Sequence, residues 1–190
     1  MGARLRRLVA EYRRIREEFA GNPFVRVEPM AGDPPDRYIV TYRVPGLRWD
    51  AVSGQAVQLN HHQAEIYLHV GYPREKPKCT IRTPIWHPNM GDYICIADHW
   101  AAGETLVDII VHIGDMIQYK IYNTASPVNT AAATWTNQNQ RRFPVGRIDL
   151  LQPEPDISLL PAQEEPGAET DLQITLDSPT PANDLEITLE

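Results

Sequence analysis

YPREKPKCTIRTPIWHPNMGDYICIADHW, residues 72–100, is the stretch that decides the fold of this chain. It contains a strand bounded by prolines, the turn His87-Pro88-Asn89, and a cysteine, Cys95, in an apolar run eight positions after the histidine. A free cysteine often packs as a small buried hydrophobic residue, so Cys95 taken alone fits a place in the core. The residues around it favour a reactive thiol.

The order of these landmarks resembles the core of the ubiquitin-conjugating enzymes. That family has a Tyr-Pro-x-x-Pro-Pro segment, a strand, a His-Pro-Asn turn and then a catalytic cysteine. The matching segments here are Tyr72-Pro73, Lys76-Pro77-Lys78, Ile85-Trp86-His87-Pro88-Asn89 and Ile94-Cys95. A short Pro-Asn turn alone is a weak signal, but order, spacing and flanking strand together are specific. The likeness continues through a later helix and a Ser-Pro turn, and it covers roughly residues 1–145.

The resemblance implies an α+β, UBC-like fold: an N-terminal helix, a four-stranded antiparallel meander, an active-site loop, a long helix and a short C-terminal helix. The residue pattern agrees with this order. Apolar residues at helical spacing predict an amphipathic helix over residues 3–20. A second apolar stripe, opened by a capping box of Thr105 and Asp108, predicts a helix over residues 105–121. Short β-rich runs predict four strands, at residues 25–28, 37–44, 64–70 and 79–83.

Charge divides the chain into two parts. Residues 1–147 carry 18 basic and 14 acidic side chains, whereas residues 148–190 carry 11 acidic and no basic ones. The second part also holds six prolines and a short repeat, DLQITL at 171–176 and DLEITL at 184–189. It has too little apolar surface to offset the entropy of ordering. We therefore expect a UBC-like conjugating domain over residues 1–147 and a disordered, acidic, proline-rich tail over residues 148–190.

Composition argues against several functional classes. The mildly basic body has no clustered basic patch with interleaved aromatics, so no nucleic-acid partner is expected. The chain has no apolar run long enough to span a membrane and no apolar leader, so we expect a cytoplasmic protein without a membrane partner. The cysteines, Cys79 and Cys95, lack a CxxC or a matching histidine pair, so neither a disulfide nor a metal site is expected. We expect no cofactor.

The resemblance also implies a chemistry. Cys95 would accept the activated C-terminus of a ubiquitin-like modifier as a thioester and pass it to a lysine of a protein substrate. Because thiolates are strong nucleophiles, no adjacent histidine base is required. Asn89 would either donate a hydrogen bond to the tetrahedral oxyanion or hold the active-site loop, and His87 would build the turn. Ser126 occupies the family position that orients or deprotonates the lysine, and a serine is better suited to orienting.

Further partners follow from the same resemblance. In that family a basic first helix docks the activating enzyme, so Arg6, Arg7 and Arg13 are candidates for this contact, with a merely solvated helix face as the alternative. The His-to-Cys interval is shorter than in typical eukaryotic members, and Ala97 replaces a usual aspartate. This trimming resembles bacterial members, which are encoded beside an activating enzyme, a modifier and a deconjugating metalloprotease.

Two other functional classes stay open at this point. The first is a catalytically inactive relative that serves as an adaptor, a class that usually lacks the cysteine. The second is a cysteine hydrolase, which needs a histidine base beside Cys95, supplied by His87 or His99. Cys79 lies in an expected strand with nothing nearby to lower its pKa, and we assign it to the core.

Overall fold

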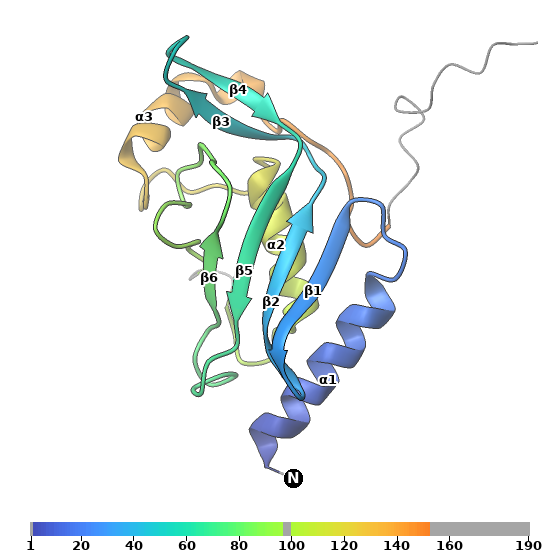
Figure 1. Cartoon of the computed structure of the whole chain (residues 1–190). Coiled ribbons are helices and arrows are strands. Elements are labelled where there is room, and N and C mark those ends of the chain that lie inside the picture. Colours follow the sequence, from blue (N-terminus) through green and yellow to red (C-terminus); the bar gives the residue numbers. More distant parts are fainter. Residues whose placement is uncertain (1, 97–99, 153–190) are drawn as a thin grey trace, which may run out of the picture. The chain divides into compact units, whose positions relative to one another are not determined.

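One antiparallel sheet forms the centre of the computed structural model, which describes residues 2–96 and 100–152 (Figure 1). Its strand order is β1-β2-β5-β6. The four strands are β1 (Val25–Gly32), β2 (Pro35–Tyr42), β5 (His62–Tyr67) and β6 (Lys78–Ile81). These are the strands expected from the β-rich runs, and each pairs antiparallel with its neighbour. The α+β fold with a four-stranded meander is therefore confirmed.

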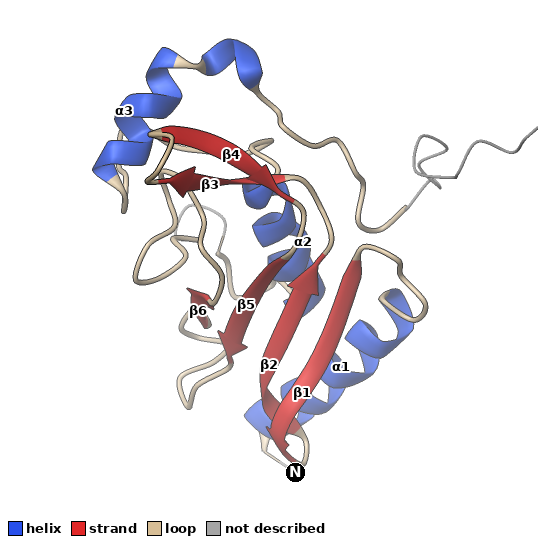
Figure 2. Cartoon of the chain, turned by 45° about the horizontal axis from the view of Figure 1, so that its top comes forward, coloured by secondary structure: helices blue, strands red, loops and turns tan. Residues whose placement is uncertain are grey.

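Two helices cover one face of this sheet, α1 (Ala3–Glu18) and α2 (Leu106–Ile117) (Figure 2). The sheet residues that meet them are large and fully buried; those of β2 are Tyr38, Val40 and Tyr42. The Tyr42 hydroxyl donates a hydrogen bond of 3.0 Å to the carbonyl oxygen of Ile110. Such a bond satisfies a polar group inside the core and fixes α2 against the sheet.

The start of α2 follows the sequence prediction, whereas its end does not. Thr105 and Asp108 form the expected reciprocal capping box. The helix ends at Ile117 rather than at residue 121, because Tyr119 adopts a left-handed backbone conformation with φ of 58°. This reversal turns residues 119–123 back toward the His-Pro-Asn turn.

A second, two-stranded sheet was not predicted. Strands β3 (Gly46–Asp50) and β4 (Gln55–Leu59) form a hairpin between β2 and β5. Its loop is longer than the two-residue turns that give the strongest hairpin signal. The hairpin lies beside α3 (Thr130–Gln138) (Figure 2). A 3-10 helix, η1 (Gln140–Arg142), follows α3. Hairpin, α3 and the end of α2 share a small aromatic core, whose members include Leu47, Ala56, Trp86, Tyr119, Trp135 and Phe143.

The packed body extends beyond residue 147. Leu150 is 1% exposed and belongs to the main core. The side chain of Gln118 donates to the carbonyl oxygen of Ile148 at 3.1 Å and accepts from its N–H at 2.8 Å. The chain therefore stays packed on the body as far as Leu150, beyond the boundary that charge alone suggested at residue 147. The rest of the expected tail, from residue 153 on, lies outside the described residues.

Candidate active site

The buried side chain of His87 supports the active-site turn from inside the protein. Its side chain is fully buried, its Nδ1 accepts the N–H of Asn89 at 3.1 Å, and its Nε2 donates to the carbonyl oxygen of Ile121 at 3.2 Å. Burial lowers the pKa of His87 to about 3, so the ring is neutral at physiological pH. With Nδ1 accepting and Nε2 donating, one tautomer links the turn to the segment that follows α2. The structure thus gives His87 the turn-building place expected from sequence.

Asn89 joins the turn to the loop formed by residues 123–126. Its Nδ2 donates to the carbonyl oxygen of Asn123 at 2.8 Å and, over 3.4 Å, to that of Ser126. Its Oδ1 accepts the N–H of Asn123 at 2.7 Å. The Asn89 side chain is buried, and it pairs with both the N–H and the carbonyl oxygen of Asn123, as the backbone of a neighbouring β-strand would. Of the two expected roles of Asn89, this geometry favours holding the loop.

Cys95 follows directly on this arrangement. Its backbone N–H donates to the carbonyl oxygen of Asn89 at 2.9 Å, and the N–H of Ile94 donates to that of Cys79 at 2.8 Å. The segment that carries Cys95 is therefore held between the turn and the edge strand β6. The side chain of Cys95 is partly exposed, as a thiol that meets a large substrate must be.

The second cysteine differs in every respect that matters for reactivity. Cys79 is only 4% exposed and lies in the main core. Burial raises the pKa of its thiol to about 12, so Cys79 stays protonated and unreactive. The sequence prediction that Cys79 is a core residue is confirmed.

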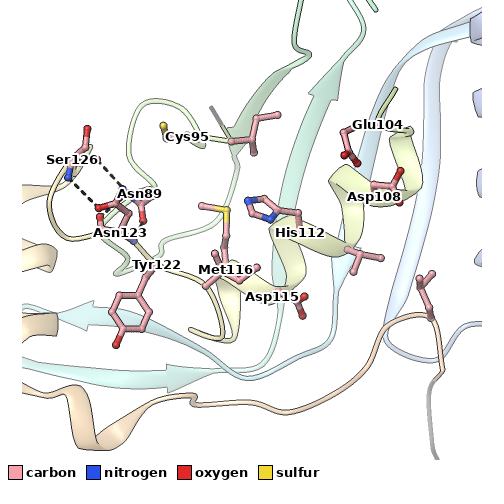
Figure 3. Close-up of a pocket in the computed structure, with 14 residues that line it drawn as sticks. Asn89, Cys95, Glu104, Asp108, His112, Asp115, Met116, Tyr122, Asn123 and Ser126 are labelled. Atoms are coloured by element: carbon pink, nitrogen blue, oxygen red, sulfur yellow. Dashed lines mark hydrogen bonds between the residues drawn. The ribbon is translucent and has the colours of Figure 1, made fainter. Parts of the chain in front are cut away.

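A groove of about 700 Å³ opens at Cys95 and continues along α2 (Figure 3). The Cys95 end is formed by the three polar residues Asn89, Asn123 and Ser126. The α2 end combines apolar and charged side chains, including Val111, His112, Asp115 and Met116. An open groove with this mixed polar and apolar lining has room for an extended peptide segment.

Ser126 lies at the exposed lip of this groove. Its backbone N–H donates to Oδ1 of Asn123 at 3.3 Å. The structure therefore brings Ser126, Asn89 and Cys95 to one site, as the sequence predicted. It adds two residues that sequence reasoning missed, Asn123 and His112. An Asn three residues before a Ser-Pro pair is a turn signal that pointed to Asn123, whereas His112 had no local signal.

The three arginines proposed for docking differ in their surroundings. Arg6 and Arg13 are exposed, and Arg13 lies 3.9 Å from Glu17 in an exposed ion pair. Arg7 points inward: its Nε lies 2.6 Å from Oε1 of the buried Glu11, and it also donates to the carbonyl oxygen of Glu104. Arg7 therefore holds α1 to the start of α2, and its side chain is less available for docking than those of Arg6 and Arg13.

Some expectations lie outside the described residues. Ala97 and His99 fall in the segment 97–99, of which the structure describes nothing. Within residues 2–96 and 100–152, no group of three or more His, Cys, Asp or Glu side chains is arranged to hold a metal ion. In the same residues, no helix is long and apolar enough to cross a bilayer.

Comparisons with known proteins agree with this site. Residues 54–146, which include the turn, Cys95 and Ser126, match the model of the ubiquitin-conjugating enzyme family. No curated protein sequence matches the chain. The structure is similar to the E2 domain of a Toxoplasma gondii ubiquitin conjugating enzyme, with a TM-score of 0.53 and 21% sequence identity over 73% of this chain and 89% of that one. The chain is thus similar to the ubiquitin-conjugating enzyme family over residues 54–146, and its fold is that of an E2 domain.

Proposed function

We propose that the protein is a ubiquitin-like-protein conjugating enzyme, which holds a modifier C-terminus as a thioester on Cys95 and transfers it to a lysine. One observation carries this proposal. The accessible thiol, Cys95, opens into a peptide-sized groove beside Asn89 and Ser126, whereas the other thiol is buried and protonated. The groove gives an extended C-terminal tail a path to the thiol.

Loading is an exchange between two thioesters. The Cys95 thiolate adds to the carbonyl carbon of the modifier's terminal residue, which arrives as a thioester on the activating enzyme. A new C–S bond forms, the old C–S bond breaks, and the activating enzyme's sulfur leaves with the electron pair. The two sulfurs have similar leaving ability, so the protein needs only to expose Cys95 and to place the carbonyl group.

Transfer to lysine is the more demanding step. An acceptor lysine has a pKa of about 10.4, so only its small neutral fraction at pH 7 is nucleophilic. Its Nζ adds to the carbonyl carbon, the C–N bond forms, Cys95 leaves as a thiolate, and the extra proton on Nζ passes to solvent. We infer that Ser126 orients the incoming amine and that Asn89 keeps the loop of Ser126 in place.

The oxyanion of this step also needs a donor. One N–H of the Asn89 amide is engaged at 2.8 Å, while the other makes only the 3.4 Å contact with the carbonyl oxygen of Ser126. That long contact is weak, so this second N–H is the donor that Asn89 has left to offer the oxyanion while its other two bonds hold the amide in place. We propose this donation as a second role of Asn89, beside the loop-holding role that the geometry favours.

The activating enzyme is proposed to dock on the exposed face of α1 that carries Arg6 and Arg13. A substrate lysine and a ubiquitin-like modifier complete the set of partners. The bacterial origin and the deconjugating metalloprotease remain proposals that rest on the shortened His-to-Cys interval. The cytoplasmic location remains a proposal that rests on the amino-acid sequence.

The hydrolase alternative loses one of its two candidate bases. Both ring nitrogens of His87 are hydrogen-bonded and its pKa is lowered to about 3, so it cannot take a proton from Cys95 at neutral pH. His99 lies outside the described residues. His112 lines the groove with Cys95 and is a further candidate base for a hydrolase. The adaptor alternative is disfavoured by the accessible thiol.

A single reaction separates the three classes. The full chain is mixed with ubiquitin activated as the thioester of 2-mercaptoethanesulfonate, with and without free lysine, and the products are followed on non-reducing gels. The proposal predicts a reducible protein–ubiquitin adduct that lysine converts to a ubiquitin–lysine amide. Absence of any adduct would indicate an adaptor. Accelerated release of free ubiquitin without the amide would indicate a hydrolase.

A further inference from the structure

The loop of residues 123–126 borders the groove without belonging to a helix or strand, so something else must define its shape. Its first residue, Asn123, is bound from both sides. The Asn89 side chain pairs with the N–H and the carbonyl oxygen of Asn123, at 2.7 and 2.8 Å. This pairing fixes the backbone at the start of the loop to the buried turn.

The side chain of Asn123 then shapes the rest of the loop. Its Oδ1 accepts the N–H of Ala125 at 2.9 Å and that of Ser126 at 3.3 Å. This is an Asx turn, in which a side-chain carbonyl replaces a backbone acceptor. Figure 3 shows Asn89, Asn123 and Ser126 clustered together, with hydrogen bonds that join Ser126 to the other two residues.

Through Asn123, the two sets of hydrogen bonds connect the buried turn to the exposed edge of the groove. Asn89 is buried and rigidly held, whereas Ala125 and Ser126 are exposed. An exposed loop without internal bonds samples many conformations. The Oδ1 atom of Asn123 is therefore the acceptor that limits where the backbone of Ser126 lies relative to Cys95.

We propose that Asn123 is a positioning residue for transfer to lysine, and that it acts by holding Ser126 beside Cys95. The inference rests on the proposed function and deepens it. Asn123 does not touch the thiol chemistry directly in this account. Loading needs only an accessible thiol, so Asn123 matters when an amine must be aimed at the thioester, where a displacement of about 1 Å costs up to ~100-fold in rate.

Two substitutions and one matched control test this role. Asn123→Ala removes the side-chain acceptor, and Asn123→Asp keeps an oxygen that accepts both N–H groups. Asn129→Ala is the control, because Asn129 makes the same kind of bond, to the N–H of Ala132 at 2.9 Å, as the cap of α3. Asn129 does not line the groove. The bonds lost in Asn123→Ala are replaced by water at exposed positions, so its urea midpoint should fall no further than that of the control.

The readout is discharge of preformed thioester in a single turnover. Each variant is loaded with ubiquitin from its 2-mercaptoethanesulfonate thioester, excess donor is removed, and either free lysine or hydroxylamine is added. Hydroxylamine is a small, strongly nucleophilic amine that does not depend on orientation. We expect Asn123→Ala to load normally, to discharge to lysine about 10- to 100-fold more slowly, and to react with hydroxylamine at the wild-type rate. Asn123→Asp should recover most of the lysine rate.

Three results would overturn the positioning role: an unchanged lysine rate in Asn123→Ala, an equal loss with both amines, or an equal loss in Asn129→Ala. Wild-type protein that forms no thioester would instead overturn the proposed function itself. Amide hydrogen exchange gives a check that does not depend on activity. The N–H groups of Ala125 and Ser126 should exchange more slowly in the wild type than in Asn123→Ala, and equal rates would remove the structural basis of the inference.

Discussion

At the scale of single residues, the site depends on polar side chains whose partners are backbone groups. His87 bonds the backbone of Asn89 and Ile121, and Asn89 bonds that of Asn123 and Ser126. Such bonds fix the path of the chain more strictly than side-chain pairs do, because backbone groups cannot rotate away. The turn thus fixes the positions of the segment that carries the thiol and of the loop of residues 123–126.

The buried His87 predicts a loss of stability in acid. Its pKa is about 3 in the folded protein and 6.5 in an unfolded chain. Between these values the unfolded state binds the proton and the folded state does not, so protonation favours unfolding. The stability is complete above pH 6.5 and falls as the pH is lowered, by about 2 kcal/mol between pH 7 and pH 5.

Urea denaturation at pH 7 and pH 5 measures this loss. His87→Gln should be less stable at pH 7, yet it should lose about 2 kcal/mol less than the wild type on going to pH 5. His61→Gln, at an exposed position, should keep the full wild-type pH dependence. The account of His87 fails if its variant and the wild type lose stability equally.

At the scale of elements, α1 shows what apolar periodicity predicts correctly about a helix and what it does not predict. The helix and its buried Leu8, Ile15 and Phe19 follow from the spacing of apolar residues. Leu5 and Val9 share that spacing but remain 39% and 43% exposed. Glu11 is instead buried, because its carboxylate accepts hydrogen bonds from the backbone N–H of Leu106 and other groups. A periodicity count cannot foresee a partner supplied from 95 positions away.

The hairpin of β3 and β4 is the larger omission. Its strands are short, and its four-residue connection gives a weak turn signal. Its stability comes from Leu47 and Ala56 packing on Tyr119 and Trp86, which are remote in sequence. By contrast, the turn, Cys95 and Ser126 were predictable because the family likeness rests on a local string of residues. The pairing of Asn123 with Asn89 and the inward direction of Arg7 depend on tertiary contacts and were not predictable.

The surroundings of α1 predict two different results for its arginines. Arg7→Glu places a second carboxylate against the buried Glu11 and removes its ion-pair partner, so the free energy of unfolding should fall by about 3–5 kcal/mol. Arg13→Glu changes an exposed position and should alter stability by no more than about 0.5 kcal/mol. Chemical denaturation of the two single variants makes this comparison.

The same variants test the docking proposal for α1. Arg13→Glu, combined with Arg6→Glu, should slow loading by the activating enzyme at low salt and have little effect at high salt. Discharge from thioester formed with the small-molecule donor should not change. If loading is unaffected at low salt, these arginines only form a solvent-exposed helix face and do not dock the activating enzyme.

At the scale of the whole molecule, the body brings together segments from most of its length around one thiol. The sheet and α1 support β6 and the segment of Cys95, α2 lines the groove, and the aromatic core beneath the hairpin fixes Trp86 next to His87. The two cysteines differ in burial, because Cys95 is partly exposed whereas Cys79 lies in the core. The central claim of this account is that Cys95 carries the modifier.

Intact-mass spectrometry of the adduct formed with the ubiquitin thioester tests that claim most directly. The account predicts one ubiquitin per wild-type chain and per Cys79→Ala chain, an adduct that reducing agent removes, and none on Cys95→Ala. Cys95→Ser should form a slower adduct that resists reducing agent, because an alkoxide leaves less readily than a thiolate. An adduct that persists on Cys95→Ala, or that disappears in Cys79→Ala while that variant remains folded, would contradict the account.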